Sequence, residues 1–328
     1  MKLKDLGEFG FIERIKQGVT GGQGIHLGIG DDCAVLDLPP GHVLLTTTDM
    51  LVEDIHFRRD WTDLENLGRK SVSINVSDVA AMGGQPRHLY LSLGFPKDFP
   101  LEGLDSFIKG FLEACKDYEV TLVGGDTCSS PGPFVISVTV EGSVAKNDYV
   151  ARRGAQPGDI IYVSGTLGDS AMALHLLQNG RSPDSFLIDR HINPQARTFL
   201  GAALAAAHVP SAMIDLSDGL LADLGHILEC SAAGALVEET LLPLSPSFRI
   251  EHEKAPELIR LALAGGEDYE LLFTVPPAKE DLLTGISQTT ALPLTRVGRI
   301  TGENLKLEVR DANGVLYTPS RGGFNHFR

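Results

Sequence analysis

Cysteine is scarce in this chain and is not arranged for any of its usual structural roles. The 328 residues include only four cysteines, at positions 33, 115, 128 and 230. No two of them form a Cys-x-x-Cys pair, and their spacing does not suit a zinc site. We therefore expect reduced thiols, as is typical of a cytoplasmic protein.

Long apolar runs and positive charge are also in short supply. No window approaches the ~20 continuous apolar residues of a membrane span, and the first ten residues, MKLKDLGEFG, lack the apolar core of a signal peptide. The 28 Lys and Arg residues against 43 Asp and Glu residues give a net charge of −15. This excess argues against non-specific binding to nucleic acid or to an anionic membrane. A phosphate ligand would have to be held by metal ions, backbone N–H groups or a few arginines.

The familiar nucleotide and hydrolase motifs are absent. The sequence contains no Gly-x-x-x-x-Gly-Lys-Ser/Thr, no His-Arg-Asp kinase loop, no His-Glu-x-x-His and no Gly-x-Ser-x-Gly. The glycine-rich segment 21–24 neither matches the dinucleotide fingerprint nor follows a predicted strand. A Ser/His/Asp triad stays open, because residue order alone does not exclude it.

What the chain does contain is the composition of a globular protein, with 43% hydrophobic residues, 22% charged residues and 36 glycines. Its length favours two domains. A turn-rich cluster at 151–159 places the boundary, so we expect an N-terminal domain at 1–148 and a C-terminal domain at 149–328.

Alternating and helical periodicities predict the helices and strands. In the first half they are helices 6–16, 63–82 and 101–118 with strands 42–49, 88–95, 120–123 and 134–144, which is an α+β pattern. In the second half they include strands 160–164, 212–215 and 269–275, helices 171–178, 196–207 and 257–264, and a polar loop at 181–194.

The segment Gly28–Phe57 concentrates acidic side chains, and no Lys or Arg lies among them. The group comprises Asp31, Asp32, Asp49, Glu53, Asp54 and His56. Carboxylates gathered on rigid elements repel one another and need a counter-charge. The simplest counter-charge is a divalent cation with oxygen ligands.

The predicted helix 63–82 has two stripes. Val72, Val76 and Val79 form an apolar stripe, while Ser71, Asn75 and Asp78 form a polar one. An ordinary solvent-facing side is the alternative interpretation of the polar stripe. The lack of long charged side chains over 71–82 favours a buried helix whose polar stripe faces partners or a ligand.

Five segments repeat one arrangement, a carboxylate beside Gly, Ser or Thr at the end of an element. They are 30–32, 48–49, 125–126, 215–218 and 266–268. One such case is ordinary turn chemistry. Five of them, together with Asp78, favour phosphoryl transfer, which needs positioning and charge neutralisation by Mg²⁺ more than covalent help. We also expect Asp218 to cap the helix that begins near Leu220.

Taken together, the motifs resemble the thiamine-monophosphate kinase family of the aminoimidazole-ribotide-synthetase-related superfamily. The segments that carry the resemblance span nearly the whole chain: 7–12 (GEFGFI), 28–34 (GIGDDCA), 47–49 (TTD), 56–57 (HF), 75–84 (NVSDVAAMGG), 124–127 (GGDT), 152–155 (RRGA), 215–220 (DLSDGL) and 265–271 (GGEDYEL). The resemblance implies an α+β N-terminal domain that dimerises through its sheet, followed by an α/β C-terminal domain.

The resemblance also implies an activity and a set of site residues. The activity is direct phosphorylation of thiamine monophosphate by ATP, which yields thiamine diphosphate with the help of several Mg²⁺ ions. The implied metal ligands are Asp31, Thr47, Thr48, Asp49, Asp78, Asp126, Asp215 and Asp218. The implied ATP contacts are Gly125, Asp126, Arg152 and Ser217. The implied contacts to thiamine are His56, Glu267 and Phe324, where Phe324 stands at a tail position that is often Trp or Tyr in the family.

Two alternatives remain open at this point. One is another ATP-dependent synthetase of the same superfamily. Synthetases of this superfamily can carry a reactive cysteine near the N-terminus or at the C-terminal end. This alternative is disfavoured because the first cysteine here is Cys33 and the sequence ends in His326-Phe327-Arg328. The other is a non-catalytic protein that binds Mg²⁺ and nucleotide. No catalytic nucleophile is assigned, and the roles of Asp32, Asp54 and Asp268 are left unassigned.

Overall fold

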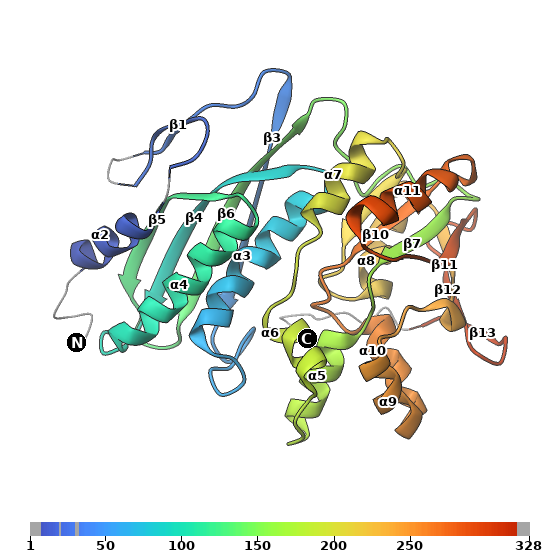
Figure 1. Ribbon diagram of the computed structural model, residues 1–328. Coiled ribbons are helices and arrows are strands. Elements are labelled where there is room, and N and C mark those ends of the chain that lie inside the picture. Colours follow the sequence, from blue (N-terminus) through green and yellow to red (C-terminus); the bar gives the residue numbers. More distant parts are fainter. Residues whose placement is uncertain (1–7, 20, 30–32, 320–328) are drawn as a thin grey trace. The chain divides into compact units, whose positions relative to one another are not determined.

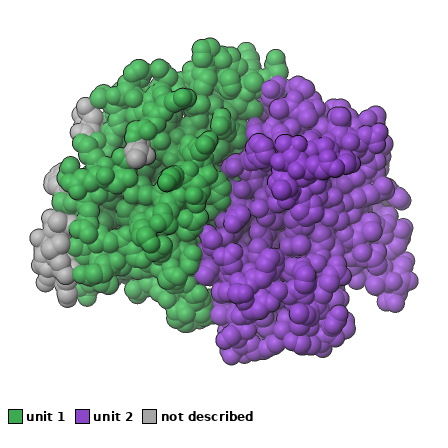
Figure 2. Space-filling view, in the orientation of Figure 1, with its two compact units in different colours: residues 1–79, 84–147 green, residues 80–83, 148–328 purple. Residues whose placement is uncertain are grey.

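The computed structural model describes the chain except for residues 1–7, 20, 30–32 and 320–328 and the side chains of Glu8 and Phe9. It divides into two compact units (Figure 2). The first comprises residues 1–79 and 84–147, and the second comprises residues 80–83 and 148–328. No helix among the described residues is long and apolar enough to cross a membrane.

The first unit is built on a four-stranded sheet with the order β3-β6-β4-β5. Its strands are β3 (His42–Val52), β4 (Gln85–Phe95), β5 (Thr121–Ser129) and β6 (Val135–Ala145). The helices α3 (Leu64–Ala81) and α4 (Leu101–Asp117) lie along one face of this sheet (Figure 1). The unit also holds α2 (Glu8–Gly18) and the small antiparallel pair β1 (Ile25–Leu27) and β2 (Val35–Leu36).

Aromatic side chains fill the core of the first unit. Phe134 is fully buried and contacts the rings of Phe95, Phe99 and Phe107 at centroid distances of 5.3 to 6.2 Å. The apolar stripe of α3 is buried as predicted, with Val72 and Val76 at 0% exposure. Strand β3 alternates, so that Leu44 and Met50 remain 52% and 55% exposed on the side away from α3.

Strand β5 differs from the prediction. The sequence indicated a strand that ends at Val123, before Gly124-Gly125-Asp126. The strand instead continues to Ser129, because β4 pairs with it in parallel as far as Phe95 opposite Ser129. Asp126 therefore lies within a strand and not at its end, which corrects the expected arrangement for this segment.

The second unit holds a seven-stranded sheet with the order β13-β12-β9-β11-β7-β10-β8. Its strands are β7 (Ile160–Ser164), β8 (Ala212–Asp215), β9 (Gly234–Glu238), β10 (Leu271–Val275), β11 (Leu294–Thr301), β12 (Leu307–Arg310) and β13 (Leu316–Tyr317). Among the strands that the structure describes in this sheet, only β9 and β12 pair in parallel. Along β10, Leu272 belongs to one buried cluster and Phe273 to another, so each face of the sheet carries its own core.

Helices supply the rest of both cores. They are α5 (Asp169–Gln178), α6 (Ser185–Ile192), α7 (Thr198–Ala206), α8 (Leu220–Ser231), α9 (Pro246–Lys254), α10 (Ile259–Ala264) and α11 (Asp281–Thr290). Short 3₁₀ turns cover Glu239–Leu241, Pro256–Leu258 and Pro277–Lys279. Leu224 and Leu228 of α8 pack in one cluster, and Leu200 and Leu204 of α7 pack in the other.

Helix α6 corrects a second prediction, because 181–194 was expected to be a loop. The Asp184 side chain caps the helix by accepting a hydrogen bond of 2.9 Å from the Leu187 N–H. Leu187, Arg190 and His191 are buried, so tertiary contacts stabilise a helix of only eight residues.

Candidate active site

Strand β3 and helix α3 bring three of the expected metal ligands together in the first unit. Thr47 Oγ1 donates a hydrogen bond of 2.5 Å to Asp78 Oδ2, and the Asp49 N–H donates to Asn75 Oδ1 at 3.1 Å. Ser71 and Asn75 are buried. The polar stripe of α3 thus faces the strand and not the solvent.

The two carboxylates of this group disfavour each other's charge. Burial, and then the nearby charge of Asp78, raise the pKa of Asp49 to about 6. Carboxylates that repel at this range are suited to a cation with hard oxygen ligands.

Thr48 points away from this group, because successive residues of a strand face opposite sides of the sheet. Its hydroxyl donates to the Val138 carbonyl at 3.1 Å and accepts from the Thr139 hydroxyl at 3.0 Å. The structure therefore does not bring the Thr48 side chain to Asp78.

Gly125 and Asp126 lie on β5, at the opposite edge of the sheet from β3. Two strands lie between these edges, and three inter-strand steps correspond to about 14 Å. A Cβ at Gly125 would lie 1.9 Å from the Leu91 carbonyl oxygen, so only glycine fits there. Asp126 is exposed and accepts a hydrogen bond of 2.8 Å from the Thr127 N–H.

His56 lies in the turn that follows β3. Its Nδ1 accepts a hydrogen bond of 3.0 Å from the Val52 N–H, so the neutral ring carries its proton on Nε2. The nearby Glu53 has a structural role, because it accepts from the Phe134 N–H at 2.9 Å and from Arg59 Nε at 2.5 Å. Asp54 is exposed and has a left-handed φ of 64°. Asp31, Asp32 and Phe324 lie outside the described residues.

In the second unit, β8 ends at the buried Asp215 and leads into Ser217 and Asp218. The expectation that Asp218 caps the next helix is wrong. The cap residue of α8 is Gly219, and the Asp223 side chain reaches back to accept from the Asp218 and Gly219 N–H groups at 3.1 and 3.0 Å. Burial, together with the charges of Asp215 and Asp218, raises the pKa of Asp223 to about 8. These three carboxylates form a second acidic group.

A second loop, Gly265–Glu270, lies directly against this acidic group. The Glu267 N–H donates to the Ser217 carbonyl at 2.8 Å, and the Tyr269 N–H donates to the Leu216 carbonyl at 2.9 Å. A Cβ at Gly266 would lie 2.3 Å from the Ser217 carbonyl oxygen. The structure thus brings Glu267 together with Ser217 and Asp218.

Arg152 lies beside the same strand at its other end. The Met213 N–H donates to the Ala151 carbonyl at 3.1 Å. This bond holds Ala151, the residue before Arg152, alongside β8. The Arg152 carbonyl accepts from the Ser231 hydroxyl at 3.5 Å, and the Arg152 side chain is exposed. An exposed guanidinium here can make the bidentate contact that arginine offers to phosphate.

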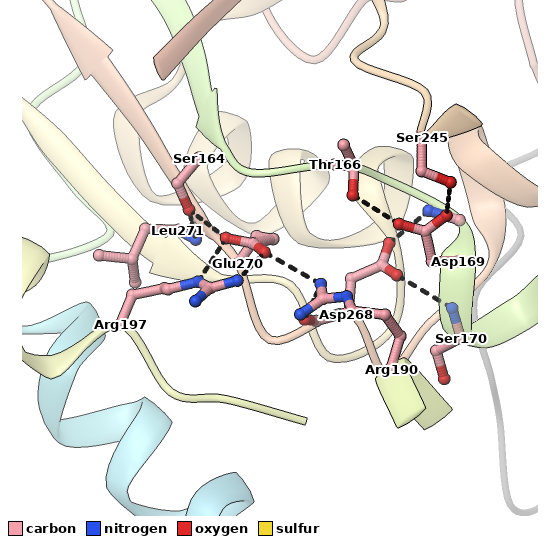
Figure 3. A network of polar contacts seen from close by, with 11 residues as sticks. Ser164, Thr166, Asp169, Ser170, Arg190, Arg197, Ser245, Asp268, Glu270 and Leu271 are labelled. Carbon is pink, nitrogen blue, oxygen red and sulfur yellow. Dashed lines mark hydrogen bonds and ion pairs between the residues drawn. The ribbon is translucent and has the colours of Figure 1, made fainter. Parts of the chain in front are cut away.

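A buried network of charged groups supports the Gly265–Glu270 loop (Figure 3). Glu270 has no exposed surface and accepts hydrogen bonds from Ser164 Oγ at 2.6 Å, Arg197 Nε at 2.7 Å and Arg190 Nη2 at 2.9 Å. Burial alone would favour the protonated acid, but the two arginines outweigh it and lower the pKa of Glu270. A Cβ at Gly165, whose φ is +58°, would lie 2.2 Å from Glu270 Oε1.

Asp268 and Asp169 extend the network to the start of α5. Asp268 Oδ2 accepts from the Gly168 N–H at 2.7 Å, and Asp169 accepts from the hydroxyls of Thr166 and Ser245 at 2.5 Å each (Figure 3). Asp268 therefore connects the loop to the first turn of a helix, whose N–H groups offset part of the cost of burying its negative charge.

Sequence reasoning missed Arg190, Arg197, Asp223 and Glu270. A signal was present for two of them, because Arg190 stands near the apolar residues 186–188 (FLI) of an otherwise polar segment and Glu270 directly precedes LLF. A charged residue inside an apolar run is expected to be paired if the run is buried.

No described cluster of three or more His, Cys, Asp or Glu side chains has the geometry of a metal site. The donors nevertheless suit Mg²⁺, because carboxylate and hydroxyl oxygens are its preferred protein ligands. Burial, and then repulsion by neighbouring carboxylates, raise the pKa values of Asp49 and Asp223, and a bound cation would relieve the repulsion.

Comparisons with known proteins identify the class. Residues 30–144 match the family "AIR synthase related protein, N-terminal domain", and residues 156–310 match "AIR synthase related protein, C-terminal domain". The chain belongs to this AIR synthase related family. The two-domain fold class expected from the sequence is confirmed.

Within the family, several similar proteins are thiamine-monophosphate kinases. The chain is 42% identical to the thiamine-monophosphate kinase of Haemophilus influenzae over 98% of each chain. It is also similar to the crystal structure of thiamine-monophosphate kinase from Stenotrophomonas maltophilia, with a TM-score of 0.83, 38% identity and coverage of 92% and 96% of the two chains. AaThiL complexed with AMPPCP and TMP gives a TM-score of 0.77 at 36% identity, over 100% of this chain and 99% of that one. The family resemblance inferred from the motifs is confirmed.

Proposed function

We propose that this protein is a thiamine-phosphate kinase that transfers a phosphoryl group from ATP to thiamine monophosphate and so makes thiamine diphosphate. The observation that carries the proposal is the full-length similarity to thiamine-monophosphate kinases, one of them a complex with AMPPCP and TMP. The carboxylate groups at Asp49 and Asp78 and at Asp215 and Asp218 supply the oxygen donors that this chemistry requires.

The protein's own contribution to the reaction is positioning. Asp31, Thr47, Asp49, Asp78, Asp126, Asp215 and Asp218 would hold Mg²⁺, which neutralises the charge of the transferring phosphate when bound, whereas the Thr48 hydroxyl faces the other side of the sheet. Their distribution over several separate groups favours more than one ion. Gly125, Asp126, Arg152 and Ser217 would contact ATP, with glycine backbone and guanidinium groups directed to phosphate oxygens. His56, Glu267 and Phe324 would hold the thiamine part. The transfer is direct, without a phosphorylated enzyme.

We also propose that the protein is a homodimer. The uncovered side of β3 exposes Leu44 and Met50, an apolar surface that a second copy of the sheet would bury. The position of Asp126 on the edge opposite β3 agrees with a site completed by the partner chain. A cytoplasmic location fits both the free thiols and the use of ATP.

The test is an assay of the purified protein with Mg-ATP and thiamine monophosphate, with the product identified by mass. We expect thiamine diphosphate to form in equal amount with ADP. The Asp78→Asn variant should lose activity, whereas Asp63→Asn, at the other end of the same helix, should retain it, because Asn also caps a helix. ATP binding without any turnover would instead support a non-catalytic nucleotide-binding protein. ATP consumption without thiamine diphosphate would point to another synthetase of the family.

The variant His56→Ala tests whether His56 contacts thiamine monophosphate and not ATP. We expect a higher KM for thiamine monophosphate with little change in the KM for ATP. A change confined to ATP would contradict the role proposed for His56.

A further inference from the structure

Helix α6 places two consecutive cationic or ionisable residues, Arg190 and His191, against the Gly265–Glu270 loop. That loop has an unusual backbone, because Glu267 and Tyr269 have left-handed φ angles of 67° and 50°. Neither residue is glycine, so this conformation persists only if the surroundings hold it. Contacts from 216–217 hold one side of the loop, and α6 holds another.

Arg190 does more than neutralise Glu270. Arg197 already pairs with both carboxylate oxygens of Glu270, and Arg190 adds a third charged contact, to Oε1. The contact that distinguishes Arg190 is the hydrogen bond of 3.0 Å from its Nη2 to the Asp268 backbone carbonyl (Figure 3). Arg190 Nε is buried without a partner among the described residues. The Nη2 bond thus ties α6 to the backbone of the loop.

His191 contacts the functional side chain of the loop. Its Nδ1 lies 3.4 Å from Glu267 Oε2 and 3.0 Å from Ser170 Oγ. The His191 side chain is 10% exposed, so packing fixes the orientation of the ring. A fixed ring beside a partly exposed carboxylate restricts the directions in which that carboxylate can point.

We propose that Arg190 and His191 are positioning residues for thiamine monophosphate: Arg190 fixes the loop backbone through the Asp268 carbonyl, and His191 orients the Glu267 carboxylate. This inference rests on the proposed function and on the role given there to Glu267. Neither residue needs to touch the substrate. Their effect on binding passes through the loop.

The experiment measures KM for each substrate in His191→Leu, His191→Gln and Arg190→Lys. For His191→Leu we expect KM for thiamine monophosphate to rise about tenfold, the loss typical of one charge-assisted contact. KM for ATP should change by less than about twofold, since the loop holds the thiamine side in the proposed function. His191→Gln restores a donor toward Glu267 and should recover most of the affinity. Arg190→Lys keeps the positive charge but loses the planar guanidinium whose Nη2 donates to both the Asp268 carbonyl and Glu270 Oε1, so it should also raise KM for thiamine monophosphate.

A matched control is Arg310→Lys, which alters another Arg–Glu pair of the second unit, with Glu238 at 2.7 Å. It should leave both KM values unchanged. Hydrogen exchange of the 265–270 backbone gives a readout that does not depend on turnover. We expect faster exchange at Glu267 and Tyr269 in Arg190→Lys than in the control.

The outcomes separate the two proposals. If the unaltered protein makes no thiamine diphosphate, the proposed function fails, while faster exchange in Arg190→Lys still supports the positioning of the loop. If the unaltered protein is active and His191→Leu leaves KM for thiamine monophosphate unchanged, the inference is wrong. Parallel changes in both KM values, with no rescue by Gln, would reduce the two residues to a general structural role and would overturn it as well.

Discussion

Replacing Asp268 with Asn should stabilise the protein at neutral pH. The side chain is 3% exposed. Burial raises the pKa of Asp268 from 3.8 to about 7, although the charge of Arg190 opposes the shift. Between these two pH values the folded protein keeps a proton that the unfolded chain has already released. The free energy of unfolding of the unaltered protein therefore falls as the pH rises through this window.

The magnitude follows from the size of the shift. Each unit of pKa corresponds to about 1.4 kcal/mol, so the accumulated cost at pH 7 is about 4 kcal/mol. Asn has no such cost. The Asn amide oxygen can still accept from the Gly168 N–H. The amide nitrogen, however, replaces the carboxylate oxygen that accepts weakly from the Ser170 N–H at 3.5 Å, and this loss lowers the gain in stability by about 1 kcal/mol. We expect a net gain of about 3 kcal/mol at pH 7 and almost none at pH 4.5.

Guanidinium unfolding at pH 4.5, 5.5, 6.5 and 7.5 measures this difference. Far-UV circular dichroism is the suitable probe, because the only tryptophan, Trp61, belongs to the first unit and Asp268 to the second. The control is Asp184→Asn at the exposed cap of α6, where burial is outweighed by the bond from the Leu187 N–H and the pKa is lowered. Relative to the unaltered protein, Asp184→Asn should lose stability as the pH rises, whereas Asp268→Asn should gain it. A stability difference for Asp268→Asn that stays constant from pH 4.5 to 7 would refute the reasoning.

Three further predictions concern charge and exposed apolar surface. Asp49→Asn should abolish most kinase activity yet leave the melting temperature unchanged or higher, because it removes repulsion with Asp78; a melted variant would make Asp49 structural. Glu270→Gln should destabilise the fold by about 3–5 kcal/mol in chemical unfolding, because it leaves the buried Arg190 and the partly buried Arg197 without their anion, and an unchanged midpoint would contradict this. Leu44→Glu should shift the protein from dimer to monomer in analytical ultracentrifugation, whereas an unchanged mass would remove the exposed side of β3 from the interface.

Local pattern predicted most elements of the fold, because apolar periodicity is recorded in neighbouring residues. Strand 212–215 was predicted with its observed bounds, and helix α3 within one residue at each end. The elements that were misjudged depend on distant partners. Strand β5 continues through Gly124-Gly125-Asp126, a turn-like composition, because β4 offers a parallel edge to pair with. Helix α6 forms in a polar segment between Pro183 and Pro194 because its buried face has partners in the loop 268–270.

The residues of the candidate site also fall into those that local pattern predicts and those that depend on distant partners. The stripe of Asn75 and Asp78 could be read from helical spacing, and its contacts with Thr47 and Asp49 agree with that interpretation. The Arg190–Glu270 pair joins residues 80 positions apart, which no local pattern records. The assignment of an N-cap to Asp218 followed a sound rule, but the helix begins after Gly219, and Asp223, one turn into the helix, accepts from the Asp218 and Gly219 N–H groups instead.

The close approach of Gly165 to Glu270 limits how this protein can evolve. Any side chain at position 165 would enter the space of the Glu270 carboxylate, and its φ of +58° already disfavours residues other than glycine. Position 165 therefore cannot change first. A shorter acid at position 270 would open the space, and only in that background would alanine at position 165 avoid the collision. In a survey of double variants, these two positions should show strong positive epistasis, and the order in which they are substituted should decide which lineages remain viable.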